Sequence, residues 1–223
     1  FRGVTVNFDK GGLYYDPSVG SNWWNYYFKP IYLPTKKKQT PRKMTLREAD
    51  QSLRAGLKMT RLRAYELLHK YVKPLPHIQQ KIDAFAAEYF QGKTVVGIHY
   101  RGTDKKSEAP RVPFEMIYEA IDALEFQDFL LFVATDEAVF LAEISARYPG
   151  RVVAADAMRS TDGSPLHFNT SHQYQVGEEA AIDCLLLSRC DLLIRTPSFL
   201  SLYTTYFNPH MTVLLIENSF SSL

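Results

Sequence analysis

The stretch Thr94-Val95-Val96-Gly97-Ile98-His99-Tyr100-Arg101-Gly102-Thr103-Asp104-Lys105 joins an apolar run to a cluster of charged side chains. The apolar part, residues 94–99, predicts a fully buried strand. In open α/β sheets, ligands bind at the carboxyl ends of such strands. The residues delivered to that end are an imidazole, two cations and a carboxylate. This combination favours a phosphorylated, nucleotide-linked ligand.

Strand and helix patterns alternate from this point to the end of the chain. The strands are predicted at residues 94–99, 129–134, 152–154, 192–194 and 212–216. The helices between them are predicted at residues 113–124, 136–147, 177–187 and 198–207. Several of the strands are nearly continuous apolar runs, as in a parallel sheet covered on both faces. The alternation predicts an α/β domain with a doubly wound, Rossmann-like parallel sheet over residues 93–223.

Residues 1–92 alternate between aromatic clusters and basic helical stretches, and they are expected to form a smaller mixed region. A hairpin is predicted over residues 4–15, because two β-prone runs flank a Gly-containing turn. The aromatic cluster at residues 21–28 predicts a short helix capped by Ser21 or Asn22. Core packing is the favoured role for these aromatic rings, with stacking on sugar rings as the alternative.

Two longer helices are predicted in the same region. The capping box Thr45-Leu46-Arg47-Glu48 is expected to open a helix that carries Leu53, Leu57 and Leu67. A second, amphipathic helix is predicted at roughly residues 77–89.

The composition bounds the class of protein. The chain has 223 residues, 46% of them hydrophobic, which is enough for a sizeable core. A net charge of +2 is too mild to indicate nucleic acid as the main partner. Cys184 and Cys190 are expected to be buried thiols rather than a disulfide, and no zinc-type spacing is present. No apolar run approaches the length of a membrane span, so no spanning helix is expected.

Arg101, Thr103 and Lys105 are the candidate phosphate ligands. The chain has neither a Gly-x-Gly-x-x-Gly fingerprint nor a Walker A sequence, so a different phosphate site is needed. The guanidinium fork of Arg matches phosphate oxygens, and Lys adds a point charge. The alternative is a surface cluster of ion pairs with Asp104 and Glu108, although the position after a buried strand favours a ligand site. Glu108 is either a general base or a solvated loop residue.

Four further polar residues have both a structural and a functional interpretation. Asp136, with Thr135, suits the cap of the next helix, and it also lies at the carboxyl end of a strand. His167 lies in a long polar loop of a kind that is often functional, and the alternative is an ordinary surface or core histidine. Asp183 is an acid in an almost wholly apolar helix, so it needs a partner, either a neighbouring loop or a ligand. Ser198 suits an N-cap, and a helix N-terminus also binds phosphate.

Taken together, these segments resemble the α1,6-fucosyltransferase superfamily, which includes the core N-glycan fucosyltransferases and bacterial relatives. The resemblance covers about residues 70 to 208. It rests, in chain order, on His99-Tyr100-Arg101-Gly102-Thr103-Asp104-Lys105, Ala134-Thr135-Asp136, Ile182-Asp183 through Ser188, and Thr196-Pro197-Ser198-Phe199. It implies a GT-B-like fold, with residues 93–223 binding the donor and residues 1–92 on the acceptor side.

The resemblance also implies roles for the donor-binding residues. Arg101 would bind the β-phosphate of GDP, and Ser198 would contact the diphosphate. His99 and Asp183 would recognise guanine, whose N1 and N2 groups can donate together to a carboxylate. The implied donor-binding set is His99, Arg101, Thr103, Asp104, Lys105, Asp136, His167, Asp183 and Ser198.

The implied reaction is inverting transfer of L-fucose from GDP-fucose to a glycan hydroxyl, with no metal and no cofactor beyond the donor substrate. Glu108 would be the base that deprotonates the acceptor, and Asp104 and Lys105 would shape its loop. The chain departs from the family in two places. Gly102 stands where many members carry a second Arg, and one residue is missing between Lys105 and Glu108.

Residues 1–69 match the family poorly, so the sequence does not name the acceptor. A bacterial enzyme of this kind would act in the cytoplasm and a eukaryotic one in the Golgi lumen. A non-catalytic module that binds a nucleotide sugar or a glycan is the main alternative; it would keep Arg101, His99 and Asp183 but not need Glu108. A hydrolase or phosphatase is the other, and neither a nucleophile elbow nor a Cys-x5-Arg sequence supports it.

Overall fold

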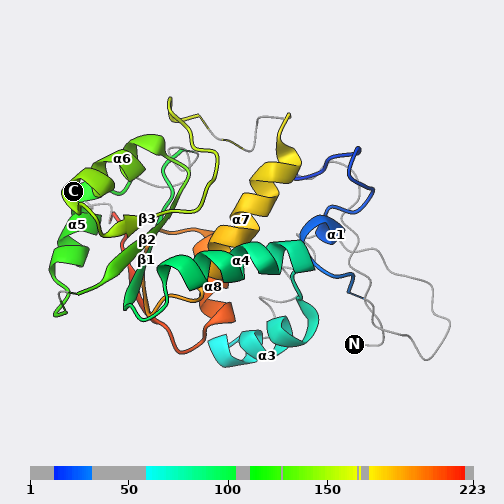
Figure 1. Ribbon diagram of the computed structural model, residues 1–223, viewed down its shortest axis with the longest axis horizontal. Helices are drawn as coiled ribbons and strands as arrows, with labels where there is room; N and C mark the ends of the chain where they lie inside the picture. The colour runs from blue at the N-terminus through cyan, green and yellow to red at the C-terminus, as the bar shows by residue number, and fades with distance from the viewer. Residues whose placement is uncertain are drawn as a thin grey trace, which may run out of the picture.

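The computed structural model describes residues 13–31, 59–103, 111–126, 128–164, 166 and 171–218. Its centre is a five-stranded sheet in which neighbouring strands are parallel (Figure 1). The strands are β1 (Val95–Tyr100), β2 (Leu130–Thr135), β3 (Val152–Val153), β4 (Leu192–Arg195) and β5 (Thr212–Leu215). All five predicted strands are therefore present, each within one residue of its predicted ends.

The strand order is β3-β2-β1-β4-β5. The chain builds one half of the sheet outward from β1, then returns to β1 and builds the other half. The register sets His99 of β1 between Ala134 of β2 and Arg195 of β4, so the carboxyl ends of these strands lie at one edge. The change of direction between β1 and β4 is the switch point at which such sheets bind ligands. The predicted doubly wound, Rossmann-like sheet is confirmed.

Helices cover both faces of the sheet (Figure 1). They are α4 (Pro76–Tyr89), α5 (Phe114–Asp122), α6 (Ala138–Arg147), α7 (Gln173–Leu187) and α8 (Phe199–Phe207). α5 and α6 pack on one face, and α4, α7 and α8 pack on the other. Successive side chains of a strand point to opposite faces, so Val95 joins the core under α4 and α7 while Val96 joins the core under α5 and α6. This double cover explains why β1 is apolar and buried along its length.

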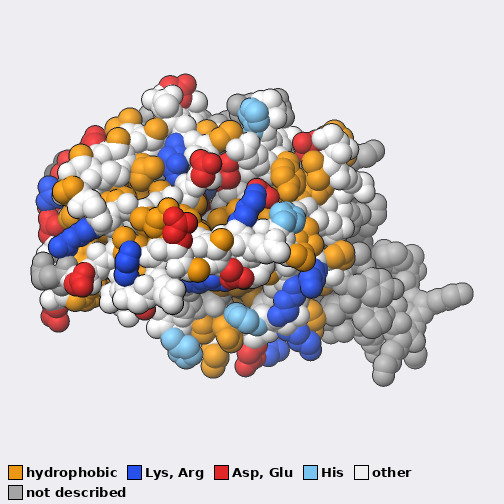
Figure 2. Space-filling view, viewed as in Figure 1, with side chains coloured by type: hydrophobic (Ala, Val, Ile, Leu, Met, Phe, Trp, Pro, Cys, Tyr) orange, Lys and Arg blue, Asp and Glu red, His pale blue; other side chains and the backbone are white. Residues whose placement is uncertain are grey.

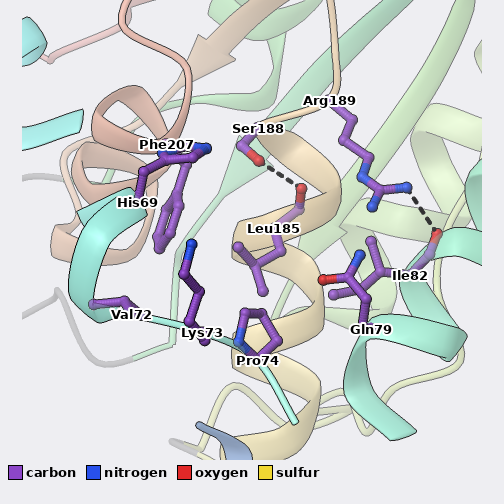
Figure 3. Close-up of a pocket in the computed structure, with 10 residues that line it drawn as sticks. All are labelled: His69, Val72, Lys73, Pro74, Gln79, Ile82, Leu185, Ser188, Arg189 and Phe207. Atoms are coloured by element: carbon purple, nitrogen blue, oxygen red, sulfur yellow. Dashed lines mark hydrogen bonds between the residues drawn. The ribbon is translucent and has the colours of Figure 1, made fainter. Parts of the chain in front are cut away.

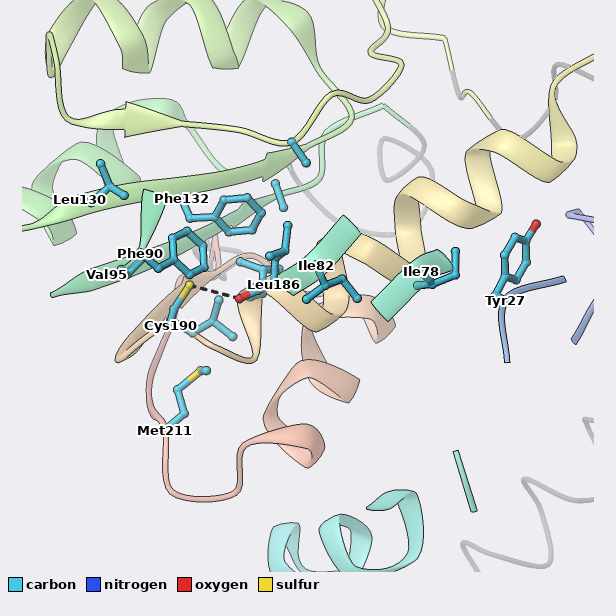
Figure 4. Packing of buried hydrophobic residues seen from close by; sticks show 14 of the residues in the cluster. Tyr27, Ile78, Ile82, Phe90, Val95, Leu130, Phe132, Leu186, Cys190 and Met211 are labelled. Carbon is cyan, nitrogen blue, oxygen red and sulfur yellow. Dashed lines mark hydrogen bonds between the residues drawn. The ribbon is translucent and has the colours of Figure 1, made fainter. Parts of the chain in front are cut away.

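The core under α4 and α7 continues beyond the sheet (Figure 4). It runs from Phe132 on β2, through Leu186 on α7 and Ile82 on α4, to Tyr27. Tyr27 is 2% exposed, which confirms core packing as the role of this part of the aromatic cluster. Segments from both sides of residue 92 share this core, and the division of the chain into residues 1–92 and 93–223 stays a prediction.

The aromatic segment forms the short helix α1 (Trp24–Tyr27). The predicted caps Ser21 and Asn22 are wrong, because the N-cap position is Trp23, which makes no side-chain capping bond. Asn22 lies one residue earlier, and its Oδ1 accepts the Trp24 N–H at 3.2 Å. The preceding residues differ from the prediction: Leu13 and Tyr14 form a turn rather than a strand. The ring of Tyr14 packs edge-on against Trp23, at 5.6 Å between centroids, which favours a compact turn over an extended strand. The first strand of the predicted hairpin lies outside the described residues.

The helix that carries Leu67 begins later than predicted. It is α3 (Arg61–Tyr71), and the Thr60 side chain caps it by accepting the Arg63 N–H at 3.2 Å. The backbone of Thr60 is extended, so a helix cannot run through this residue from an earlier start. The capping box at residues 45–48, with Leu53 and Leu57, lies outside the described residues.

α7 begins four residues before its predicted start at Gly177. A glycine inside a helix normally weakens it, so its place within α7 needs a structural reason. In the structure Gly177 lies where a Cβ would clash with the Tyr27 hydroxyl of α1. That hydroxyl donates to the Tyr174 carbonyl oxygen at 2.8 Å. The glycine is therefore needed for the close approach of α1 to α7.

The surface and the two cysteines complete the description. On the face drawn in Figure 2, Lys and Arg side chains lie among Asp and Glu side chains over most of the described surface. Cys184 and Cys190 are free thiols, as expected. Within the described segments, no helix has both the length and the apolar character needed to cross a bilayer.

Candidate functional site

A pocket opens at the carboxyl ends of β1 and β2, against one side of α7. Its volume is about 100 Å³. β1 contributes His99, Tyr100 and Arg101, β2 and its loop contribute Ala134, Thr135 and Asp136, and α7 contributes Val176, Glu179, Ala180 and Asp183. Further walls come from Tyr14, Ala157, Met158, Leu166 and Leu200. Four of the predicted donor-binding residues therefore meet here: His99, Arg101, Asp136 and Asp183.

The β1 end of the pocket is held to the β4 end by hydrogen bonds. The Arg101 N–H donates to Thr196 Oγ1 at 3.1 Å, and the Thr196 N–H donates to the His99 carbonyl oxygen at 3.0 Å. His99 is 5% exposed although its side chain lines the pocket. These bonds set the backbone from which the Arg101 side chain extends into the pocket. Sequence reasoning gave Thr196 no role of its own, although it is the first residue of the motif Thr196-Pro197-Ser198-Phe199.

Asp136 does not cap the helix that follows it, which corrects one of its two predicted roles. Its Oδ1 accepts the Gly102 N–H at 3.2 Å, and its Oδ2 accepts the Thr103 hydroxyl at 2.5 Å. The N-cap position of α6 is Glu137, with no side-chain cap. Asp136 turns toward the β1 loop because parallel pairing brings the ends of β1 and β2 together. Thr103 is buried, and its hydroxyl is used to hold this loop.

Gly102 lies in close contact with the side chain of a buried acid. A Cβ there would clash with the carboxylate of Glu137, which is 4% exposed. Arg111 neutralises this buried carboxylate with an ion pair at 2.6 Å and also donates to the Tyr100 hydroxyl at 3.2 Å. Where many family members carry a second Arg, this chain has Gly102, which lies beside the buried Glu137 and its ion-pair partner Arg111.

Asp183 carries the clearest electrostatic signature of the site. Its Oδ1 is buried and accepts no hydrogen bond from the part of the chain that the structure describes. Burial raises the pKa of the carboxyl to about 7, with nearby Glu179 raising the pKa and Arg159 lowering it. A neighbouring loop was one of the two predicted partners of Asp183, and no described loop residue donates a hydrogen bond to its Oδ1. An unsatisfied buried acceptor in a pocket is costly unless a ligand donates to it.

Ser198 is the N-cap of α8, as predicted. Its Oγ accepts the Leu200 N–H at 3.2 Å. Behind it lies Arg195, which is 8% exposed and donates to Ser201 Oγ at 2.9 Å and to the Ser198 carbonyl oxygen at 3.0 Å. Burial lowers the pKa of this guanidinium. A buried cation and a helix N-terminus are both favourable to an anion at this edge of the sheet.

Glu179 also lines the pocket and was missed in the sequence. It lies one helical turn before Asp183, and its Oε2 accepts the Met158 N–H at 2.9 Å. The spacing of Val176, Glu179, Ala180 and Asp183 places them on one face of α7, and this spacing could have identified them.

Four of the predicted site residues lie outside the described residues. They are Asp104, Lys105, Glu108 and His167. Their assignments stay predictions. Within the described segments, no group of three or more His, Cys, Asp or Glu side chains could hold a metal ion.

A larger cavity, of about 380 Å³, lies elsewhere (Figure 3). Its walls come from the ends of α3, α7 and α8 and the start of α4, and are His69, Val72, Lys73, Pro74, Gln79, Ile82, Leu185, Ser188, Arg189 and Phe207. Ser188 and Arg189 lie between α7 and β4, so this cavity is near the amino end of β4. Since α/β sheets bind ligands at the carboxyl ends of their strands, the smaller pocket is the candidate site.

Comparison with known proteins assigns the chain to a family. The model of the family described as Nodulation protein Z (NodZ) matches residues 63–218, which is more than half of the 223 residues. The chain belongs to the NodZ family. The matched segment contains most of α3, all of α4, the five strands of the sheet and the helices between them.

Two curated NodZ relatives give the extent of the similarity. Nodulation protein Z of Bradyrhizobium diazoefficiens is 30% identical over 158 residues, which cover 65% of this chain and 42% of that protein. Nodulation protein Z of Sinorhizobium fredii is 30% identical over 147 residues, which cover 60% of this chain and 45% of that protein. The chain thus matches less than half the length of these NodZ proteins.

Solved structures of NodZ α-1,6-fucosyltransferase share the fold. The structure co-crystallized with GDP has a TM-score of 0.50 and 26% identity, covering 69% of this chain and 48% of that one. The structure soaked with GDP-fucose also has a TM-score of 0.50 and 26% identity, covering 70% of this chain and 49% of that one. The chain has the GT-B-like, mixed α/β fold of these fucosyltransferases.

Proposed function

We propose that this chain acts as a fucosyltransferase that moves L-fucose from GDP-fucose to a glycan hydroxyl, with inversion and without a metal ion. The observation that carries the proposal is the buried Oδ1 of Asp183, which accepts no hydrogen bond from the described residues and lies in a pocket that also contains Arg101. Guanine offers two adjacent N–H donors to a carboxylate, and a diphosphate suits the guanidinium fork. Membership of the NodZ family and the fold shared with a GDP-bound fucosyltransferase support this choice of ligand.

The residues divide the work of donor binding. Asp183 and His99 hold guanine, and Arg101 binds the β-phosphate. Ser198, at the N-terminus of α8, contacts the diphosphate, with the buried charge of Arg195 behind it. Asp136 keeps the β1 loop in shape through its bonds to Gly102 and Thr103.

The proposed transfer is a single displacement at C1 of fucose. The acceptor oxygen forms its bond to C1 as the bond between C1 and the β-phosphate oxygen breaks, and the electrons of the broken bond leave with GDP. Glu108 takes the proton of the acceptor hydroxyl. Arg101, with Lys105 from the same loop, stabilises the negative charge that builds on the leaving diphosphate.

Calorimetric titration with GDP, UDP and ADP in the presence of EDTA tests donor recognition. Binding of GDP at least tenfold tighter than UDP or ADP is expected, because only guanine presents adjacent N1 and N2 donors to Asp183. Equal binding of the three nucleotides, or no binding of any of them, would contradict the assignment of Asp183 and His99 to guanine. Selective GDP binding without transfer or hydrolysis of GDP-fucose would instead indicate a non-catalytic nucleotide-sugar module.

A further inference from the structure

A third cavity lies beside the N-terminal turns of α7. Its volume is about 310 Å³, within the range of about 300 to 1,000 Å³ that is typical of small-molecule sites. It is lined by Val19, Gly20, Ser21, Asn22, Asn25, Tyr26, His77 and Tyr174. None of these residues belongs to the donor pocket.

The lining combines aromatic rings with uncharged hydrogen-bonding groups. The side chains of Ser21 and Asn25 are exposed and make no hydrogen bond within the described part of the chain. Tyr174 packs against Tyr26 and Tyr27 at 5.8 and 5.6 Å between ring centroids, so its ring is held firmly as a wall. A rigid aromatic surface beside free amide and hydroxyl groups is the chemistry that recognises a sugar ring with its apolar face and its hydroxyls.

The charges around the cavity favour a neutral ligand. No Lys, Arg, Asp or Glu lines it. Two acids lie just outside the lining. The Asp16 backbone carbonyl accepts the Tyr26 hydroxyl at 2.6 Å. Glu178 is 9% exposed and lies 3.6 Å from His77 Nε2, 2.5 Å from Lys81 Nζ and 3.3 Å from the Tyr174 hydroxyl. An acidic sugar would find no Lys or Arg in this lining to neutralise its charge, whereas a neutral sugar needs no such partner.

The cavity and the donor pocket lie close together along α7. Tyr174 lines the cavity, and Val176 and Glu179, less than two turns further on, line the donor pocket. On the other side, Tyr14 of the donor pocket packs against Trp23, in the same segment as the Asn22 and Asn25 of the cavity. A short oligosaccharide that reaches the donor pocket could therefore extend around the start of α7 into the cavity.

We propose that this cavity binds a neutral sugar residue of the acceptor, one that is not the residue receiving fucose. The proposal rests on the function proposed above, since it assigns the cavity to the acceptor of that reaction. Asn25 and His77 are its specificity-determining side chains, and Tyr174 is its stacking surface.

The test measures binding of the whole chain, with GDP present, to an array of neutral and acidic oligosaccharides. Neutral oligosaccharides are expected to bind. Asn25→Ala and His77→Ala are each expected to weaken that binding about tenfold, a loss typical of one or two hydrogen bonds to a ligand. Gln80→Ala, which removes an exposed amide of α4 outside the cavity, is the matched control and should bind as the original chain does.

Three outcomes would overturn the proposal: no binding to any neutral oligosaccharide, unchanged binding by both variants, or a preference for acidic sugars. Calorimetry with GDP separates these outcomes from failure of the proposed function. Both cavity variants should bind GDP within about twofold of the original chain, because their side chains lie outside the donor pocket. For an oligosaccharide that accepts fucose, the variants should raise KM for the acceptor and leave kcat nearly unchanged.

Discussion

Between the sheet and α7, Phe132 and Leu186 are fully buried among apolar neighbours. Three residues earlier in the same helix, Asp183 buries a carboxylate oxygen that accepts no hydrogen bond from the described residues. The apolar layer gains free energy from burial, whereas the pocket holds a group whose burial costs free energy until a ligand arrives. One helix thus joins a stabilising region to a binding region. Substitutions in the two regions should have opposite effects on stability.

The largest effect is expected from Arg101→Ala in the pocket. The substitution removes the guanidinium that would stabilise the leaving diphosphate, so kcat/KM for GDP-fucose should fall about 10³-fold, or about 4 kcal/mol. Steady-state transfer assays measure this, and thermal unfolding should show an unchanged fold. Lys73→Ala, which removes a cation from the cavity of about 380 Å³ between α3, α4, α7 and α8, is the control and should keep full activity. Full activity in Arg101→Ala would exclude the phosphate assignment.

Leu186→Ala tests the apolar layer. Removing a fully buried leucine side chain should lower the free energy of unfolding by about 2 to 5 kcal/mol, because it leaves a cavity between α7 and the sheet. Denaturant unfolding measures the loss, and the same truncation at the exposed Leu62 should cost far less. The GDP affinity of the folded variant should be unchanged. A large loss of affinity would show that the two regions are not separable.

Asp183→Asn should separate binding from stability in a single residue. An amide oxygen accepts hydrogen bonds less strongly than a carboxylate, and the amide NH₂ opposes the donors of guanine. GDP affinity should therefore fall about 10- to 100-fold, or about 1.4 to 2.8 kcal/mol. The variant should also be more stable at pH 7, because it no longer buries a charge. Asp128→Asn, on the surface, should change neither quantity.

The pH dependence of that stability difference gives a smaller and sharper test. Burial raises the pKa of Asp183 to about 7 in the folded chain, above the value of 3.8 of an unperturbed carboxyl. Between these values the folded chain binds more protons than the unfolded chain, so this carboxyl destabilises the fold as the pH rises from 4 to 7. The advantage of Asp183→Asn should be absent near pH 4 and complete above pH 7. A constant advantage at all pH values would contradict the raised pKa.

GDP binding should show the opposite trend in the original chain. The charged form of Asp183 is the acceptor, so affinity should weaken as the pH falls below about 7. Calorimetry at several pH values measures the slope. The Asp183→Asn variant provides the reference, because it retains the titration of the GDP phosphates but lacks this carboxyl.

Local sequence patterns determined the elements of the sheet and the edge that carries the site. The five strands and the helices between them follow from apolar runs and helical spacing, which depend only on residues close in the chain. The placement of His99 and Arg101 at a pocket follows as well, because a buried strand that ends in charged residues delivers them to the carboxyl edge. The burial of Asp183 could also be predicted, because it is an acid in an almost wholly apolar helix.

Only the tertiary structure decided which partners these residues meet. Asp136 could have capped its own helix, but the parallel register of β1 and β2 brings it to Gly102 and Thr103, more than thirty residues earlier. Likewise, the role of Gly177 follows from the packing of Tyr27 against it, a residue 150 positions earlier in the chain. Such contacts depend on strand order and helix packing across long separations, and local sequence carries no record of that geometry.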